Sequence, residues 1–145
     1  MTQQREKRLL NEWLTLYHRN TLQWRNVRLG PYATSSEARM FMVKLPHCDA
    51  IYIEDDVVHI VEAKIKPTPG IISQLEYYGR LFPTTPEFSV YKDKKIQLVA
   101  LVGIDDQNVA QMCNEKNIQY IVFTPSWLTD YLFMLEKKRE SKGGE

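Results

Sequence analysis

The chain has 145 residues, of which 43% are hydrophobic and 26% are charged, and its net charge at neutral pH is +1. These values exclude a largely disordered chain and fit a globular protein with a hydrophobic core of its own. They argue against a protein that binds nucleic acid through its overall charge, while a local basic groove remains compatible with them.

Targeting and membrane signals are not evident in the sequence. No apolar run approaches the roughly 20 residues that a membrane helix needs, and the N-terminal segment MTQQREKRLL lacks the apolar core of a signal peptide. The two cysteines, Cys48 and Cys113, do not have the spacing of metal ligands. We therefore expect a cytoplasmic protein with free thiols and no membrane partner. We expect one domain over residues 1–140 and a flexible tail over residues 141–145.

The N-terminal part of the chain predicts a helix followed by a strand. Apolar residues recur at helical spacing over residues 4–18, which indicates an amphipathic helix. Residues 21–30 alternate in polarity and end at Gly30-Pro31, which indicates a strand. Residues 31–47 leave several alternatives open: a loop, a short turn of helix at 35–37, and a strand over 40–44.

A β-hairpin is predicted over residues 47–65. Apolar and polar residues alternate in HCDAIYIE and again in VVHIVEAKI, and the two arms meet at Asp55-Asp56. The segment KPTPG then breaks the chain, since two prolines and a glycine cannot continue a central strand.

The C-terminal half alternates between helices and strands. The predicted segments are an amphipathic helix over 71–82, a loop over 84–94, a strand over 96–104, a short helix over 105–117, a strand over 118–124 and a last helix over 125–140. Both strands are nearly continuous apolar runs, which is typical of strands buried on both faces. The fold class predicted is therefore α/β, with a mixed central sheet of about five strands and helices on both faces.

The hairpin carries charged residues where packing alone would favour apolar ones. Because side chains alternate across a strand, Glu62 and Lys64 project from the same face, about 7 Å apart. A turn closed between Asp55 and Asp56 places Asp49 opposite Glu62. Two carboxylates this close repel each other unless a divalent cation lies between them, and hard oxygen ligands suit Mg²⁺ or Mn²⁺. The alternative is a solvated Glu–Lys pair on an exposed strand.

These residues and the predicted order of elements resemble the PD-(D/E)xK nuclease superfamily. The resemblance implies a restriction-endonuclease-like core, in which Asp49 begins the second strand and Glu62-Ala63-Lys64 supplies the (D/E)xK element. It implies that Asp49, Glu62 and the Ala63 carbonyl bind the metal, and that Lys64 orients or activates the attacking water. Cys48 stands where the family often has proline.

The helix over 71–82 adds a second similarity. Gln74 and Tyr78 lie four residues apart and so on one helical face. They resemble the QxxxY motif of RecB-type and lambda-exonuclease-type members, in which these side chains shape the site and hold DNA. The alternative is that Tyr78 is a core aromatic residue and Gln74 an exposed one.

Many relatives add a glutamate from the first helix to the metal site. We expect Glu12 to have this role, because it lies on the Leu9 and Leu16 side of the helix; Glu6 and Glu37 are the alternatives. Some RecB-type relatives use an upstream histidine, and His18 is the candidate.

The resemblance implies a metal-dependent deoxyribonuclease that hydrolyses DNA phosphodiester bonds with Mg²⁺ or Mn²⁺. DNA is the expected partner, and a homodimer is one of the oligomeric states that relatives adopt. Two alternatives remain open: a catalytically inactive nuclease-fold module that binds nucleic acid or protein, and an unrelated α/β domain.

Overall fold

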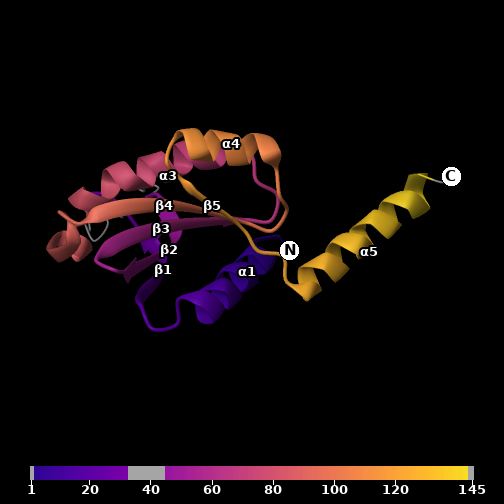
Figure 1. The fold of residues 1–145 in the computed structure, drawn as a ribbon, viewed down its shortest axis with the longest axis horizontal. Coiled ribbons are helices and arrows are strands. Elements are labelled where there is room, and N and C mark those ends of the chain that lie inside the picture. The colour runs from indigo at the N-terminus through magenta and orange to yellow at the C-terminus, as the bar shows by residue number, and fades with distance from the viewer. Residues whose placement is uncertain (1, 33–44, 144–145) are drawn as a thin grey trace.

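A computed structural model describes residues 2–32 and 45–143, which form one five-stranded sheet with helices on both faces (Figure 1). The elements are, in chain order, α1 (Thr2–Tyr17), β1 (Leu22–Arg28), β2 (His47–Glu54), β3 (Val57–Lys64), α3 (Gly70–Leu81), the 3₁₀ helices η1 (Phe82–Thr84) and η2 (Pro86–Tyr91), β4 (Lys95–Val102), α4 (Gln107–Glu115), β5 (Gln119–Val122) and α5 (Ser126–Gly143). The predicted α/β class with a mixed sheet is confirmed.

The strands lie in sequence order, β1-β2-β3-β4-β5. The first three pair antiparallel, and β4 and β5 then join in parallel, each reached through a helix that crosses over the sheet. β3 is the central strand and is paired on both sides. The strand that carries Glu62 and Lys64 is therefore held by β2 and by β4 at once.

The hairpin turn sets the register of β2 against β3. Asp55 and Asp56 both have positive φ, 52° and 65°, which is the geometry of a two-residue turn that matches the twist of the flanking strands. The pairs run from Glu54–Val57 at the turn to Ala50–Val61. This is the predicted register, and its continuation places Asp49 opposite Glu62.

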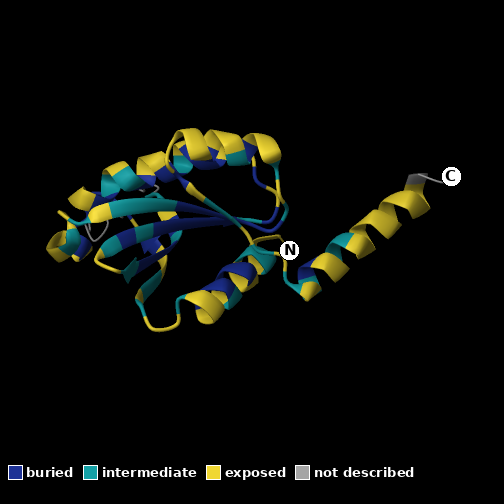
Figure 2. Ribbon diagram, in the orientation of Figure 1, coloured by how far each residue is buried: buried dark blue, intermediate teal, exposed yellow. Residues whose placement is uncertain are grey.

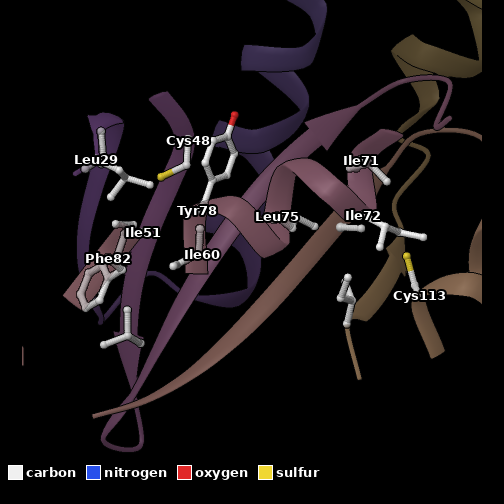
Figure 3. Packing of buried hydrophobic residues seen from close by; sticks show 14 of the residues in the cluster. Leu29, Cys48, Ile51, Ile60, Ile71, Ile72, Leu75, Tyr78, Phe82 and Cys113 are labelled. Carbon is white, nitrogen blue, oxygen red and sulfur yellow. The ribbon is translucent and has the colours of Figure 1, made fainter. Parts of the chain in front are cut away.

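One face of the sheet is covered by α3 and α4. Their apolar side chains pack with those of β1 to β4 into a buried cluster that includes Ile51, Ile60, Leu75 and Phe82 (Figure 3). Each helix buries the stripe that faces the sheet and leaves its outer side exposed (Figure 2). This packing fixes α3 directly over the strands that carry the charged residues.

The other face is covered by α1, together with the first turns of α5. Leu9, Leu10, Trp13 and Leu14 of α1 are buried in a second cluster. Leu128 of α5 completes this cluster and lies so close to Gly103 that a side-chain carbon there would approach it to 2.6 Å. The rest of α5 projects away from the sheet and is mostly exposed (Figures 1 and 2).

Three predictions about local structure need correction. β5 was expected to be buried on both faces, but it is a four-residue edge strand that pairs only with β4 and exposes Val122. The segment 84–94 contains 3₁₀ turns rather than only loop, because Pro86 opens a short helical stretch that buries Phe88. The last helix continues to Gly143, so residues 141–143 are helical.

The alternatives for residues 35–37 and 40–44 lie outside the described residues. Within the described ranges, no helix combines the length and the apolar character needed to cross a bilayer.

Candidate active site

A cleft of about 530 Å³ opens where β2 and β3 separate, between α1 and α3. Side chains from α1, β1, β2, β3 and α3 line it: Gln3, Glu6, Lys7, Leu10, Asn11, Arg25, Asn26, His47, Asp49, Glu62, Lys64, Gln74 and Tyr78. The five side chains predicted to be catalytic, Asp49, Glu62, Lys64, Gln74 and Tyr78, are all in this set. The structure therefore brings them together from three separate elements.

Asp49 is held at the point where the β2–β3 ladder ends. The last pair in the ladder is Ala50–Val61, and beyond it the Ala63 N–H donates to Asp49 Oδ2 at 2.8 Å. Because the N–H and C=O of one residue in a strand point to the same edge, the Ala63 carbonyl also faces this gap. The carboxylate of Asp49 and a backbone oxygen of β3 are thus directed to the same place.

Glu62 is a buried carboxyl group, with only 4% of its surface exposed. Its Oε1 atom is fully buried and has no hydrogen-bond partner among the described residues. Burial, and after it the nearby Asp49, raise the pKa of Glu62 to about 8, against the opposing effect of the positive charge of Lys64. An unpaired buried oxygen is unfavourable for stability, and a cation bound at this oxygen would offset that cost.

A backbone irregularity in β1 lies directly across from Asp49. Asn26 would pair with Asp49 in the β1–β2 register, but the pairs on either side are present and this one is missing. Asn26 has a φ of 51°, a left-handed conformation that asparagine tolerates better than most residues. Its neighbours Trp24 and Val27, three residues apart, contact the same core cluster, so the alternation of the strand is shifted at Asn26.

β2 shows the same shift at Asp49. Cys48 and Ile51, also three residues apart, belong to the cluster under α3, whereas Ala50 belongs to the cluster on the other face. In both strands, the alternation of side chains between the two faces of the sheet therefore shifts by one residue at the Asn26–Asp49 position. The change leaves Asp49 between the two faces, from which its side chain reaches sideways to β3.

Tyr78 belongs to the core and also lines the cleft. Its ring is 4% exposed and packs in the core beside Cys48, while its hydroxyl points out of the cluster (Figure 3). Gln74 Nε2 donates to this hydroxyl at 3.2 Å. Burial raises the pKa of the Tyr78 hydroxyl, and the charge of Glu62 adds to the effect, so the hydroxyl stays protonated at neutral pH.

Glu6, and not Glu12, lies in the cleft. Glu6 Oε2 accepts a hydrogen bond from the Ile65 N–H at 3.0 Å, next to the end of β3. Glu12 instead accepts from Trp127 Nε1 at 2.7 Å and pairs with Arg8 on the side of α1 that faces α5. The expectation that Glu12 is a metal ligand is therefore not supported by its position. Glu37 lies outside the described residues.

His47 and His18 take different positions relative to the cleft. His47 lines the cleft, where its Nε2 accepts a hydrogen bond from Arg28 at 3.3 Å. His18 lies at the far end of β2, stacked on Tyr52 and 3.2 Å from a carboxylate oxygen of Glu54. His18 does not line the cleft, and its partners Tyr52 and Glu54 lie three and five residues along β2 from Asp49, so its position does not support the role of an upstream histidine ligand.

Several polar residues of the cleft were not predicted. Asn11 and Arg25 are hydrogen-bonded to each other, and Asn26, Gln3 and Lys7 complete the rim. Asn26 carried a signal that could have been used, since asparagine is depleted in strand interiors. The α1 residues carried only a weak one, because charged residues are common on exposed helices.

The donor set of the cleft fits a hard divalent cation. Asp49 and Glu62 supply carboxylate oxygens, Ala63 a carbonyl, and Glu62 Oε1 has a vacant acceptor position. Among residues 2–32 and 45–143, no three histidine, cysteine, aspartate or glutamate side chains gather as a ready ligand group. The set therefore consists of two carboxylates and a backbone oxygen.

Comparisons of the chain with protein-family models, curated proteins and solved structures gave no match.

Proposed function

We propose that this protein is a metal-dependent nuclease that hydrolyses DNA phosphodiester bonds, of the PD-(D/E)xK type. The observation that carries the proposal is the shared cleft of Asp49, Glu62 and Lys64, in which a buried Glu62 oxygen lacks a partner among the described residues. The order α1, β1 to β3, α3, β4 agrees with the core that the resemblance implies.

The proposed metal is Mg²⁺ or Mn²⁺, bound by Asp49, Glu62 and the Ala63 carbonyl. When bound there, it would act as a Lewis acid at the scissile phosphate. The hydrogen bond from the Ala63 N–H keeps Asp49 oriented before any ligand arrives. Preorganisation of this kind removes a cost that would otherwise fall on the reaction step.

Lys64 supplies a positive charge that a metal cannot replace in the same place. It follows Glu62 by two residues, so both side chains leave β3 on the face under α3. From there the amine can contact the scissile phosphate or the attacking water. Tyr78 and Gln74 border the cleft from α3 with a hydroxyl and an amide, which can bind a phosphate oxygen.

The proposal includes a cytoplasmic location, because both cysteines are free and buried, as suits a reducing compartment. A homodimer is part of the resemblance and is tested by sedimentation velocity of the purified chain.

The deciding experiment compares the wild type with Lys64→Ala on supercoiled, linear and branched DNA in Mg²⁺ and in Mn²⁺, with EDTA as the blank. We expect the wild type to cut DNA and the variant to cut it at least about 100-fold more slowly. This is the scale expected for loss of one preorganised charge at a reacting centre. Circular dichroism should show the variant folded, since no packed apolar group is removed. RNA of the same sequence tests the choice of nucleic acid.

Two results would contradict the proposal. A folded Lys64→Ala protein that cuts at the wild-type rate would remove Lys64 from the mechanism. A wild type that binds DNA and metal but cuts no substrate would favour the inactive binding module instead.

A further inference from the structure

Arg25 occupies the side of the cleft opposite Lys64. It lies on β1, pairs with Ala50 of β2, and is one position away from Asp49 in the register. Lys64 lies on β3, two strands away, or about 10 Å across the sheet. It is also three residues further along the register, or about 10 Å along the strands, since Arg25 aligns with Ala50 and Val61. Asp49 and Glu62, two of the three carboxylates that line the cleft, therefore have Arg25 on one side and Lys64 on the other.

The Arg25 guanidinium is held in place by neutral groups. Nε donates to Asn11 Oδ1 and Nη2 donates to Gln23 Oε1, both at 2.9 Å. These bonds fix the plane of the group from α1 and from β1. They use two of its five N–H donors, and the other three have no partner among the described residues.

No carboxylate neutralises Arg25 within the described ranges. The ion pairs found there join Arg8 to Glu12, His18 to Glu54 and Lys94 to Asp56. Two other arginines of this region are also engaged, since Arg5 lies over the Tyr131 ring and Arg8 over the Trp127 ring. Arg25 is the arginine that faces the cleft with its charge uncompensated by these residues.

Arg25 is exposed at the edge of the cleft, and its guanidinium is buried only in part. Partial burial of the guanidinium lowers the pKa of Arg25 from its ordinary value, although the group remains charged at neutral pH. A cation that is partly desolvated and oriented by amides rather than by a carboxylate is ready to accept an anion from solution.

We propose that Arg25 binds a backbone phosphate of the nucleic acid one or two nucleotides from the scissile bond, with Asn11 and Gln23 acting as positioning residues for its guanidinium. The assignment rests on the proposed function, and it adds the direction of the strand: across the ends of the sheet from Lys64 on β3 to Arg25 on β1. The fork of N–H donors on arginine matches the two free oxygens of a phosphodiester.

The competing explanation is that Arg25 only fastens α1 to β1 through Asn11. That role would show as a loss of stability in Arg25 variants with no change in binding. The two explanations therefore differ in whether Arg25 variants change the affinity for DNA or only the free energy of unfolding.

The test measures binding and cutting of one fluorescein-labelled DNA, as a 20-base-pair duplex and as its single strand. Binding is followed by anisotropy in Ca²⁺, which prevents turnover, and cutting in Mg²⁺ or Mn²⁺. The variants are Arg25→Gln, Arg25→Lys and Asn11→Asp, with Arg19→Gln as the matched control. Arg19 is an exposed arginine beside the far end of β2, hydrogen-bonded to Thr15 and outside the cleft.

We expect Arg25→Gln to weaken binding by about tenfold or more. The slope of log affinity against log salt concentration should also fall by about one, the value for one lost phosphate contact. Arg25→Lys should lose part of the affinity, because the charge remains but the fork is lost. Asn11→Asp should weaken binding although Arg25 is intact, because the new carboxylate captures its charge. The Arg19 control should stay within about twofold of the wild type.

An Arg25→Gln protein that binds within twofold of the wild type, or an equal loss in the Arg19 control, would overturn the assignment. If Arg25→Gln is poorly folded, Asn11→Asp decides: unchanged binding there also overturns it. A wild type that binds but does not cut, with Arg25→Gln still weaker, would refute hydrolysis and support the Arg25 assignment. If the wild type cuts and Arg25→Gln cuts with the same KM, the Arg25 assignment is refuted while hydrolysis stands.

Discussion

Asn26 of β1 and Asp49 of β2 face each other at the one position that the β1–β2 ladder omits, and both strands change phase there. The left-handed backbone of Asn26 is therefore coupled to the direction in which Asp49 leaves its strand.

Substitutions of Asn26 should separate backbone from side chain. Asn26→Gly keeps the left-handed conformation available and should change the free energy of unfolding by less than about 1 kcal/mol, whereas Asn26→Val should lower it by about 1–2 kcal/mol. Urea unfolding measures both. Asn117, with a φ of 57° after α4, is the control: Asn117→Val should lose similar stability without changing Mn²⁺ binding, whereas Asn26→Val should weaken it.

The pH dependence of stability should report Glu62. Its pKa is about 8 in the folded protein and near 4.5 in the unfolded chain, so the folded state binds the extra proton between these values. The stability contribution is fully present below about pH 4.5 and is lost as the pH rises through 8. In EDTA, Glu62→Gln should match the wild-type melting temperature near pH 4.5 and exceed it by several degrees at pH 8.5, a gain on the order of a few kcal/mol. A constant difference across this range would contradict the assignment.

Metal binding should depend on both carboxylates and on pH. Since a cation needs ionised ligands, Mn²⁺ affinity measured by calorimetry should rise up to about tenfold per pH unit below pH 8, as Glu62 loses its proton. Asp49→Asn should abolish the binding heat. Lys64→Ala should keep the affinity or raise it slightly, because a nearby positive charge is removed. Unchanged binding in Asp49→Asn would place the metal elsewhere.

The two parts of Tyr78 can be tested one at a time. Tyr78→Phe removes the hydroxyl that accepts from Gln74 and should cost about 1 kcal/mol of stability or less, with reduced cleavage. Tyr78→Ala also empties the core beside Cys48 and should cost about 3–5 kcal/mol. Full activity in Tyr78→Phe would leave the residue a purely structural role.

Glu6 and Glu12 should respond in opposite ways. Glu6→Gln changes the charge of the cleft and should reduce cleavage by about tenfold or more with little change in melting temperature. Glu12→Gln should lower stability by about 1 kcal/mol or less through its bond to Trp127 and leave cleavage unchanged. Reduced cleavage in Glu12→Gln together with unchanged cleavage in Glu6→Gln would favour Glu12 as the glutamate that acts at the metal site.

Much of the site could be predicted because it depends on local rules. A two-residue turn and strand alternation are sufficient to place Asp49 opposite Glu62, and helical spacing is sufficient to place Gln74 beside Tyr78. These relations follow from neighbours in sequence. The element order also followed from periodicity.

The choice between Glu6 and Glu12 depended on packing between elements. Glu12 was chosen for its side of the helix, shared with Leu9 and Leu16; Leu9 is buried, but Leu16 is 61% exposed. Glu6 precedes Leu10 by four residues and Trp13 by seven, so it continues the buried stripe of α1. A carboxylate within that stripe was the usable signal. The phase change at Asn26, and the edge position of β5, arise from tertiary structure and have no comparable local pattern.

The central position of β3 has a consequence for how the cleft can move. Amides in a strand that is hydrogen-bonded on both sides exchange with solvent only through the largest openings of a protein, whereas those of a projecting helix exchange by local fraying. The amides of the stretch of β3 that pairs with both β2 and β4, Val58 to Val61, should therefore be among the slowest to take up deuterium, and the last turns of α5 among the fastest. The Ala63 amide, which donates to Asp49 at the edge of the cleft, should exchange at an intermediate rate. Substrate entry should then come from motion of side chains and flanking segments, because β3 stays paired with β4 along its whole length while its Glu62–Lys64 end is already open toward the cleft.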